Sequence, residues 1–185
     1  YLSSIKIYGD VQSKIQKDYN VFVNPDILGA TKILAEKMLE LQKFNYLNIR
    51  LPGVLCYKIN DFRRPWLNYV INRLRKNKFV NIYNSSGLFN NVIDTFEIFR
   101  LINYLGKKKK IKNGSLNFAA RKPIKIKKMI FNLKRKLSSK SKIVFKKEKS
   151  KHFILSTKKT IDDYRFRTAD TSTIINRYID KYKSL

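Results

Sequence analysis

A lysine placed among apolar residues is the first candidate for chemistry in this sequence. It is Lys32, within the stretch NPDILGATKILAEKMLE at residues 24–40. Leu28 stands four residues earlier, on the same face of the helix that this stretch predicts, and a leucine side chain can transfer no proton. A lysine cation can shift the pKa of a neighbouring group. Taken alone, however, the spacing is more typical of a surface lysine that pairs with Glu36, four residues later.

Other reactive side chains are few. His152 is the only histidine, so a catalytic dyad or a metal cluster around it is not predicted, and we expect it on the surface. Cys56 is the only cysteine; it has no CxxC spacing and indicates a small, at least partly buried side chain. Asp94 and Glu97 fall in a predicted helix, where ordinary capping would explain them. The sequence therefore predicts no metal site and no internal disulfide.

The charge of the chain is its most pronounced property. Of 185 residues, 41 are Lys or Arg and 13 are Asp or Glu, which gives a net charge of +28. Such a charge attracts polyanions, including nucleic acid, although codon usage rich in A and T would produce the same abundance of lysine, asparagine and isoleucine. A hydrophobic content of 43% excludes disorder by composition. No apolar run is long enough to span a membrane, and the first residues do not resemble a signal peptide, so we expect a cytoplasmic protein.

The first third of the chain predicts a strand, a helix and a strand. Residues 1–8 alternate in polarity and end at a Gly-Asp turn, and Asn24-Pro25-Asp26 is a strong start signal for a helix over 26–43. Its apolar stripe is formed by Ile27, Leu34, Met38 and Leu41. Residues 44–57 predict a mostly apolar strand that is broken at Pro52-Gly53. This order is the βαβ unit of a parallel sheet, and it predicts an α/β fold.

The remaining residues predict further helices and strands, with less regular spacing. We expect helices over 65–77, 93–105, 123–137 and 171–182. We expect strands over 78–83, 115–119 and 142–146, and a loop over 84–92. The Ser- and Lys-rich residues 138–151 give the weakest pattern.

Several short motifs occur in an order that identifies a family. They are SSIKIYG at 3–9, LGATKILAEKML at 28–39, RLPGVLC at 50–56, FNNVIDTFEI at 89–98 and PIKIKKMI at 123–130, followed by the Y-x-F-x-T pattern at 164–168. This ordered set resembles the extended short-chain dehydrogenase/reductase family, the NAD-dependent sugar-nucleotide epimerases and dehydratases. The resemblance implies the C-terminal part of a Rossmann-type doubly wound parallel sheet plus a small α/β substrate-binding subdomain. It assigns 1–60 to the Rossmann part and 61–185 to the substrate-binding subdomain, with interleaved Rossmann elements.

The resemblance also implies roles for individual residues. In such enzymes a serine polarises the substrate oxygen, a tyrosine is the general acid/base, and a lysine one turn later lowers the pKa of that phenol and contacts the nicotinamide ribose. The corresponding catalytic positions here are Ser4, Leu28 and Lys32. The implied cofactor-binding residues are Lys32, Pro52, Gly53 and Val54, and the implied substrate-binding residues are Ser4, Gly53, Asn90 and Asn91. Arg50 and Arg121 are weaker candidates for holding a phosphate group.

Two departures from the family pattern affect the expected activity. Leu28 replaces the tyrosine, and no GxGxxG or GxxGxxG turn for a dinucleotide pyrophosphate occurs in the sequence. We therefore expect a truncated or catalytically impaired member, with NAD or NADP as the family cofactor and a nucleotide-sugar as substrate. A homodimer through helix 26–43 is implied in the same way. Two alternatives remain: a basic nucleic-acid-binding module, for which no motif is found, and a non-catalytic scaffold of the same fold.

Overall fold

A three-stranded parallel sheet lies at the centre of one lobe of the molecule. The computed structural model describes residues 1–11, 13–56, 66–147 and 152–183. The sheet has the order β1-β3-β8, formed by β1 (Leu2–Ser4), β3 (Leu47–Leu51) and β8 (Gly114–Asn117). Both pairings are parallel, and Ser4 stands opposite Leu51 in the register. The chain is therefore an α/β protein, as predicted, and the two carboxyl ends of β1 and β3 meet at one edge.

The first predicted strand is shorter in the structure than in the prediction. Strand β1 stops at Ser4, and Ile5–Tyr8 forms a 3₁₀ helix, η1. The Ser4 side chain caps this helix by accepting a hydrogen bond from the Lys6 amide. Because this cap ends the strand, the alternation of residues 5–8 does not continue as a strand. Gly9 follows with a positive φ of 57°, which turns the chain back.

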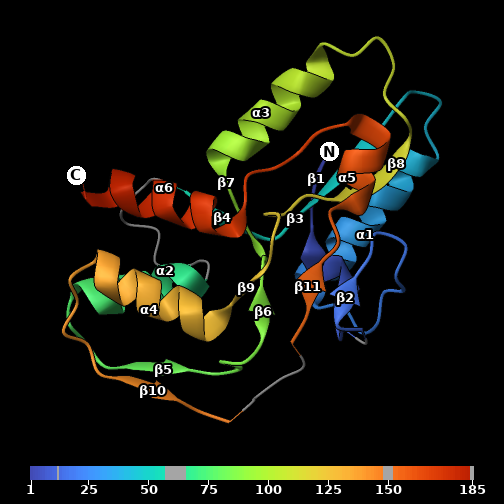
Figure 1. Cartoon of the computed structure of the whole chain (residues 1–185). Helices are drawn as coiled ribbons and strands as arrows, with labels where there is room; N and C mark the ends of the chain where they lie inside the picture. Colours follow the sequence, from blue (N-terminus) through green and yellow to red (C-terminus); the bar gives the residue numbers. More distant parts are fainter. Residues whose placement is uncertain (12, 57–65, 148–151, 184–185) are drawn as a thin grey trace.

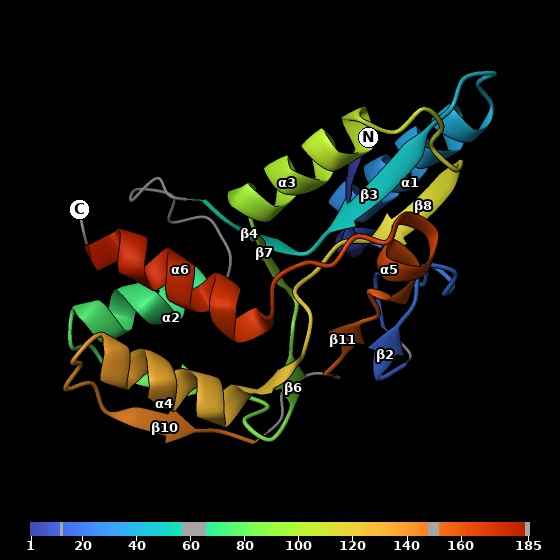
Figure 2. The ribbon, with the colours of Figure 1, turned by 45° about the horizontal axis from the view of Figure 1, so that its top comes forward.

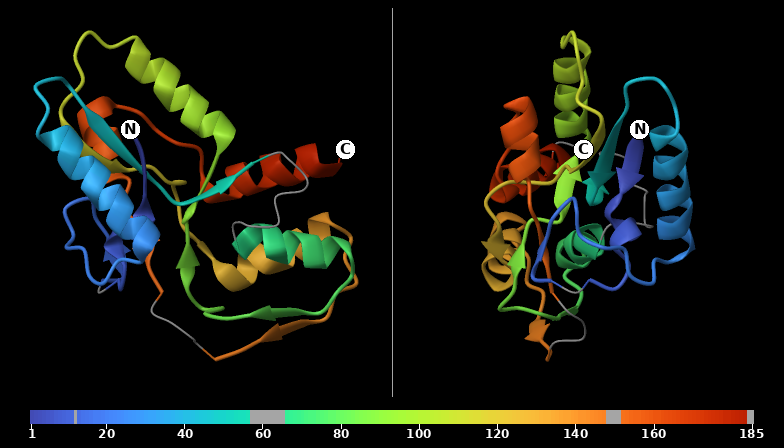
Figure 3. Two further views of the ribbon diagram at one scale, coloured as in Figure 1. Left: turned by 180° about the vertical axis from the view of Figure 1, so that it is seen from behind. Right: turned by 90° about the vertical axis from the view of Figure 1, so that its right-hand side faces the viewer.

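Helix α1 (Ile27–Glu40) packs along β1 and η1, whereas α5 (Lys158–Tyr164) packs on β8 (Figure 3). The Asp26 side chain caps α1 by accepting a hydrogen bond from the Gly29 amide, which confirms the predicted start. The predicted apolar stripe of this helix, however, lies on the molecular surface. Its exposed members are Ile27, Leu34, Met38 and Leu41. Only Gly29 and Glu36 of this helix are buried.

Pro52 moves the chain from one sheet to another. Beyond it, β4 (Gly53–Leu55) leaves the central sheet and pairs in parallel with β7 (Val92–Asp94), with Gly53 opposite Val92. The predicted break at Pro52-Gly53 is confirmed. Strand β7 is followed directly by α3 (Thr95–Gly106), the helix that runs along the top of Figure 1. The expected loop over 84–92 therefore ends in a strand.

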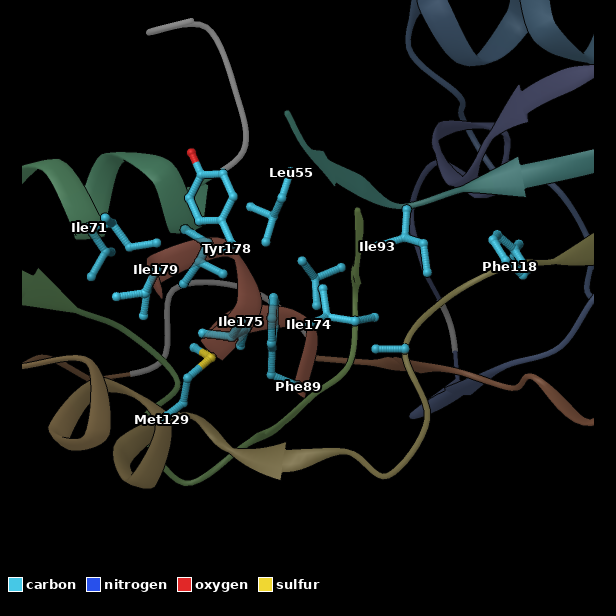
Figure 4. Close-up of a cluster of buried hydrophobic side chains, with 14 of the residues drawn as sticks. Leu55, Ile71, Phe89, Ile93, Phe118, Met129, Ile174, Ile175, Tyr178 and Ile179 are labelled. Atoms are coloured by element: carbon cyan, nitrogen blue, oxygen red, sulfur yellow. The ribbon is translucent and has the colours of Figure 1, made fainter. Parts of the chain in front are cut away.

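A second lobe contains the remaining helices (Figure 2). It is formed by α2 (Trp66–Arg75), α4 (Ile126–Lys136) and α6 (Thr171–Lys183), together with the parallel pair β5 (Val80–Ile82) and β10 (Ile143–Phe145). Buried side chains from α2, α4, α6, β4 and β7 meet in one hydrophobic cluster, which extends to Phe118 after β8 (Figure 4). This shared cluster joins the second lobe to the central sheet.

Five short strands and one short helix have no counterpart in the sequence prediction. These are β2 (Ile15–Gln16), β6 (Leu88–Phe89), β7, β9 (Ile124–Lys125), β11 (Ile154–Leu155) and helix α5. Strands β2 and β11 pair in parallel, and β6 and β9 pair antiparallel. The proposed domain boundary at 60/61 and the Pro65 start of the predicted helix lie outside the described residues. Within the described part, no helix is long and apolar enough to cross a bilayer.

Candidate functional site

Ser4 and the Pro52–Val54 segment lie at the carboxyl edge of the central sheet. Ser4 is the last residue of β1, and its register partner Leu51 is followed immediately by Pro52 and Gly53. In open α/β sheets, ligands bind beyond the carboxyl ends of the strands. The structure therefore brings Ser4 and the Pro52–Val54 segment to the edge of the sheet where a ligand is expected.

Helix α1 carries Lys32 to the same strand. The Lys32 Nζ donates a hydrogen bond to the Leu2 carbonyl oxygen at 3.1 Å and lies 4.9 Å from the centre of the Tyr1 ring. Leu2 is two residues before Ser4 on β1. The surface pair with Glu36, considered from the sequence, does not form, because Glu36 pairs with Arg50 instead. Lys32 is thus directed at the strand that ends in Ser4.

Gly29 permits the close approach of α1 to η1. A Cβ atom at this position would lie 2.4 Å from the Lys6 carbonyl oxygen, a distance that real side chains do not show. The backbone of the helix therefore passes directly over the backbone of η1. This contact fixes the amino-terminal turn of α1, which includes Leu28, beside the segment that follows Ser4.

Neither Tyr8 nor Tyr19 takes the place of the missing phenol at position 28. Tyr19 is 75% exposed, and Tyr8 is buried with its hydroxyl donating a hydrogen bond to Asn117 Oδ1 at 2.7 Å. Burial raises the pKa of Tyr8, and the neighbouring Arg50 cation only partly offsets this effect. A phenol whose pKa is raised is a poor proton carrier near neutral pH. Leu28 is itself 36% exposed, so its hydrocarbon side chain faces partly into solvent.

A buried ion pair beneath α1 was not predicted from the sequence. The Arg50 guanidinium donates to Glu36 through Nε at 3.1 Å and through Nη2 at 2.7 Å, and both side chains are at most 5% exposed. Arg50 also donates to the Tyr8 hydroxyl and to the Asp18 carbonyl oxygen. Arg50 is therefore fully engaged within the protein and does not offer its charge to a phosphate. In the sequence, the spacing of four residues favoured a pair between Lys32 and Glu36, which is wrong, because Glu36 pairs with Arg50.

Asn90 and Asn91 are bound to the protein backbone. The Asn90 amide group donates to the carbonyl oxygens of Ala120 and Leu155, and its oxygen accepts from the Leu155 amide. Asn91 donates to the Phe153 carbonyl oxygen, and its buried Oδ1 has no hydrogen-bond partner in the described part of the chain. Asn91 precedes Val92, the register partner of Gly53, so these two predicted substrate-binding positions are neighbours across the β4–β7 pair.

The remaining candidates have structural partners. Asp94 caps α3 at the Glu97 amide, and both carboxylates pair with Arg177 of α6. Arg121 donates to the Thr168 carbonyl oxygen and pairs with Asp170.

His152 and Cys56, the only histidine and cysteine, lie near short strands. The His152 ring contacts the Leu88 carbonyl oxygen, and Cys56 is a free, half-buried thiol directly after β4. Among the residues that the structure describes, no group of three His, Cys, Asp or Glu side chains could hold a metal ion.

Comparison with solved structures identifies the fold. A UDP-N-acetylglucosamine 4-epimerase from Methanobrevibacter ruminantium M1, in complex with UDP-N-acetylmuramic acid, matches all of this chain with a TM-score of 0.80 at 18% identity. The enzyme WbmG of Bordetella bronchiseptica, in complex with NAD, matches 99% of it with a TM-score of 0.79 at 12% identity. A UDP-glucose 4-epimerase from Thermotoga maritima, with UDP-glucose, matches 99% with a TM-score of 0.78 at 13% identity.

The chain has the fold of the carboxyl-terminal part of Rossmann-type epimerases. It covers 62%, 58% and 62% of the length of the three structures, respectively. No protein-family description and no curated protein matches the sequence. The predicted fold class is therefore confirmed, while the predicted division at residue 60 stays a prediction.

Proposed function

We propose that this chain is the substrate-binding, carboxyl-terminal portion of an NAD(P)-dependent nucleotide-sugar epimerase or dehydratase that is impaired in proton transfer. One observation carries the proposal: Ser4 and the Pro52–Val54 segment, which the motifs singled out separately, come to one edge of the sheet, and Lys32 contacts the strand that ends in Ser4. The two epimerases named above are in complex with UDP-sugars, and WbmG is in complex with NAD. A nucleotide-sugar is therefore the proposed ligand.

The residues present fit one end of a dinucleotide. Lys32, on α1, contacts the strand that ends in Ser4 and keeps part of its surface exposed, so its ammonium group can donate to a ribose hydroxyl. Pro52, Gly53 and Val54 line the adjacent strand end. A bound nicotinamide supplies hydride transfer. The glycine-rich turn that holds a pyrophosphate is not among these residues, so this chain by itself fits only the nicotinamide-ribose end.

Within this arrangement, each residue has a defined task. Ser4 polarises the oxygen of the sugar carbon that reacts, and Gly53 with Asn91 borders the sugar. Asn90 supports the Leu155 backbone behind them, since its amide group is already bonded. Leu28 occupies the position of the proton carrier, and its hydrocarbon side chain cannot transfer a proton. The expected consequence is weak or absent turnover with retained substrate binding.

We also propose that two copies of the chain pair through α1. The exposed residues Ile27, Thr31, Leu34, Met38 and Leu41 are spaced alternately by four and three residues, which is the seam of two packed helices. Gly29 and Glu36 lie on the opposite side and are buried within the chain itself. The outward face is thus apolar over the whole length of the helix and suits a second helix.

A cytoplasmic location is part of the same proposal. The single free thiol, Cys56, agrees with a reducing compartment.

Calorimetry with UDP-N-acetylglucosamine tests the substrate class. The chain should bind it saturably, and inorganic pyrophosphate at the same concentration should compete only weakly. Pyrophosphate is the necessary control because a net charge of +28 attracts any polyphosphate. Asn91→Ala should weaken sugar-nucleotide binding, whereas the matched variant Asn103→Ala on α3 should not. Equal binding of pyrophosphate and the sugar nucleotide, with no effect of Asn91→Ala, would contradict the proposal.

A further inference from the structure

Helix α1 is attached to the body of the protein in an unusual way. Most amphipathic helices are held by an apolar stripe that faces the core. Here the apolar stripe faces solvent, and the two buried residues of the helix are Gly29 and Glu36. Gly29 provides a close backbone contact, and Ile33 packs partly against the small cluster around Tyr8. The Glu36 carboxylate is therefore the main specific attachment of the second half of α1.

The partners of Glu36 form a continuous buried network. Arg50 binds its carboxylate with two nitrogen atoms, and Ser115 Oγ donates to Oε2 at 3.3 Å. Arg50 also donates to the Tyr8 hydroxyl at 3.1 Å, and this hydroxyl in turn donates to Asn117. The network thereby connects α1, η1, β3 and β8. Planar, two-point arginine–carboxylate pairing fixes direction as well as distance.

Each segment of the candidate site contains one member of this network. Glu36 is one helical turn after Lys32, and Tyr8 is at the end of the 3₁₀ helix that Ser4 begins. Arg50 stands two residues before Pro52 on β3. Rotation or sliding of α1 would therefore move Lys32 away from β1, and the network opposes such motion from below the helix.

We propose that the Glu36–Arg50–Tyr8 network is the positioning device that holds α1, and with it the Lys32 ammonium group, against β1. Glu36 and Arg50 are positioning residues, which act through Lys32 rather than on a substrate. The inference rests on the proposed function, which makes position 28 the place of the proton carrier. All residues of the network are in this chain, so their effect on Lys32 can be measured without an assay of enzymatic activity.

A thiol at position 28 reports the place of the lysine cation. In a Cys56→Ser background, Leu28→Cys introduces the only cysteine, whose pKa follows from the pH dependence of its alkylation rate by iodoacetamide. An unperturbed thiol has a pKa of about 8.5, and a nearby ammonium group should lower it by about one unit. Lys32→Met should restore the ordinary value and sets the full range of the measurement.

Glu36→Gln should raise the pKa of the thiol introduced at position 28 by most of that range. The direction of this change is diagnostic. If the lost negative charge acted only through its electric field, the thiol pKa would fall rather than rise. Arg50→Lys, which keeps the charge and loses the two-point geometry, should also raise it. The matched control is Glu97→Gln, a second buried glutamate paired with arginines, but on α3. It should leave the thiol pKa unchanged.

Urea unfolding of every variant separates positioning from general loss of stability. The proposal is supported if Glu36→Gln and Arg50→Lys raise the thiol pKa while Glu97→Gln, destabilised to a similar extent, does not. It is overturned if both leave the thiol pKa unchanged although Lys32→Met raises it; the proposed function would survive that result. If Lys32→Met also has no effect, the inference fails together with the assignment of positions 28 and 32.

Discussion

In the proposed function, catalytic competence depends on Leu28. General acid–base groups typically contribute about 10²–10⁴-fold to a rate. In a protein that combines this chain with a dinucleotide-binding half, Leu28→Tyr should raise turnover on a suitable nucleotide-sugar by a factor in that range, because Lys32 lies one turn away on the same face. The assay is the transient formation of bound NADH in a single turnover, followed by its absorbance, because an epimerase or dehydratase returns the hydride to the sugar and accumulates no NADH. The gain should disappear in Leu28→Tyr with Lys32→Ala; a gain that persists would show that the lysine does not serve the phenol.

Gly29 is a second residue whose identity is set by its surroundings. The Cβ of Gly29→Ala would lie 2.4 Å from the Lys6 carbonyl oxygen, so α1 would have to shift. Overpacking of this kind costs about 1–3 kcal/mol, measured as the free energy of unfolding in urea. Gly106→Ala at the end of α3 is the control, because nothing lies within 4 Å of its Cβ, and it should be neutral or stabilising by up to ~1 kcal/mol. Equal effects of the two substitutions would contradict the close contact.

Tyr8 links stability to pH. Tyr8→Phe removes the hydrogen bonds to Asn117 and from Arg50 and should cost about 1–3 kcal/mol near neutral pH. Burial raises the pKa of the phenol, so the folded state favours its neutral form. The stabilisation from the neutral phenol is present in full below the unfolded-state pKa of about 10, and it is lost as the pH rises through the pKa in the folded state. Urea unfolding at about pH 8 and about pH 10.5 should therefore show a smaller difference between wild type and Tyr8→Phe at the higher pH.

At the scale of elements, the sequence predicted the features that depend on a few neighbouring residues, such as the start of a helix or the break of a strand. The start of α1 at its Asp26 cap and the break of the strand at Pro52 each depend on a few adjacent residues, and both were read from the sequence. The end of β1 was not, because Ser4 can either continue a strand or cap a turn. The Glu36–Arg50 pair and the two-residue strands β2 and β11 depend on contacts between distant parts of the chain, which no local pattern carries.

The outward face of α1 makes the sharpest prediction for an element. Leu34, 62% exposed on the helix seam, should lie in the interface of the proposed dimer. Leu34→Lys should convert the dimer into a monomer, because it places a charge in an apolar contact. Phe99→Lys on α3, where the phenylalanine is 61% exposed, is the matched control and should leave the dimer intact. Sedimentation velocity distinguishes the species; a wild-type protein that sediments as a monomer at high concentration would refute the pairing.

At the scale of the whole molecule, the positive charge is unevenly distributed along the chain. Residues 66–93 and 98–147 contain no acidic residue. These segments form most of the second lobe, which also exposes aromatic side chains such as Tyr69 and Phe131. The buried Arg50 is already paired within the protein. The fold of an epimerase and a large positive charge are thus separate properties of one chain, and only the first follows from the arrangement of its elements.

The charge predicts a definite behaviour toward nucleic acid. If it reflects codon usage alone, binding to random DNA should be no tighter than the nonspecific range of roughly 10⁻⁴–10⁻⁶ M and should fall steeply with salt, because counterion release is then its only source. Fluorescence anisotropy with single- and double-stranded DNA of several sequences, over increasing salt, measures both properties. We expect no preference for sequence or structure. A complex that persists at physiological salt with an affinity tighter than that range, and that prefers one sequence or structure, would favour the nucleic-acid-binding alternative, because base stacking on exposed aromatic rings contributes affinity that salt does not remove.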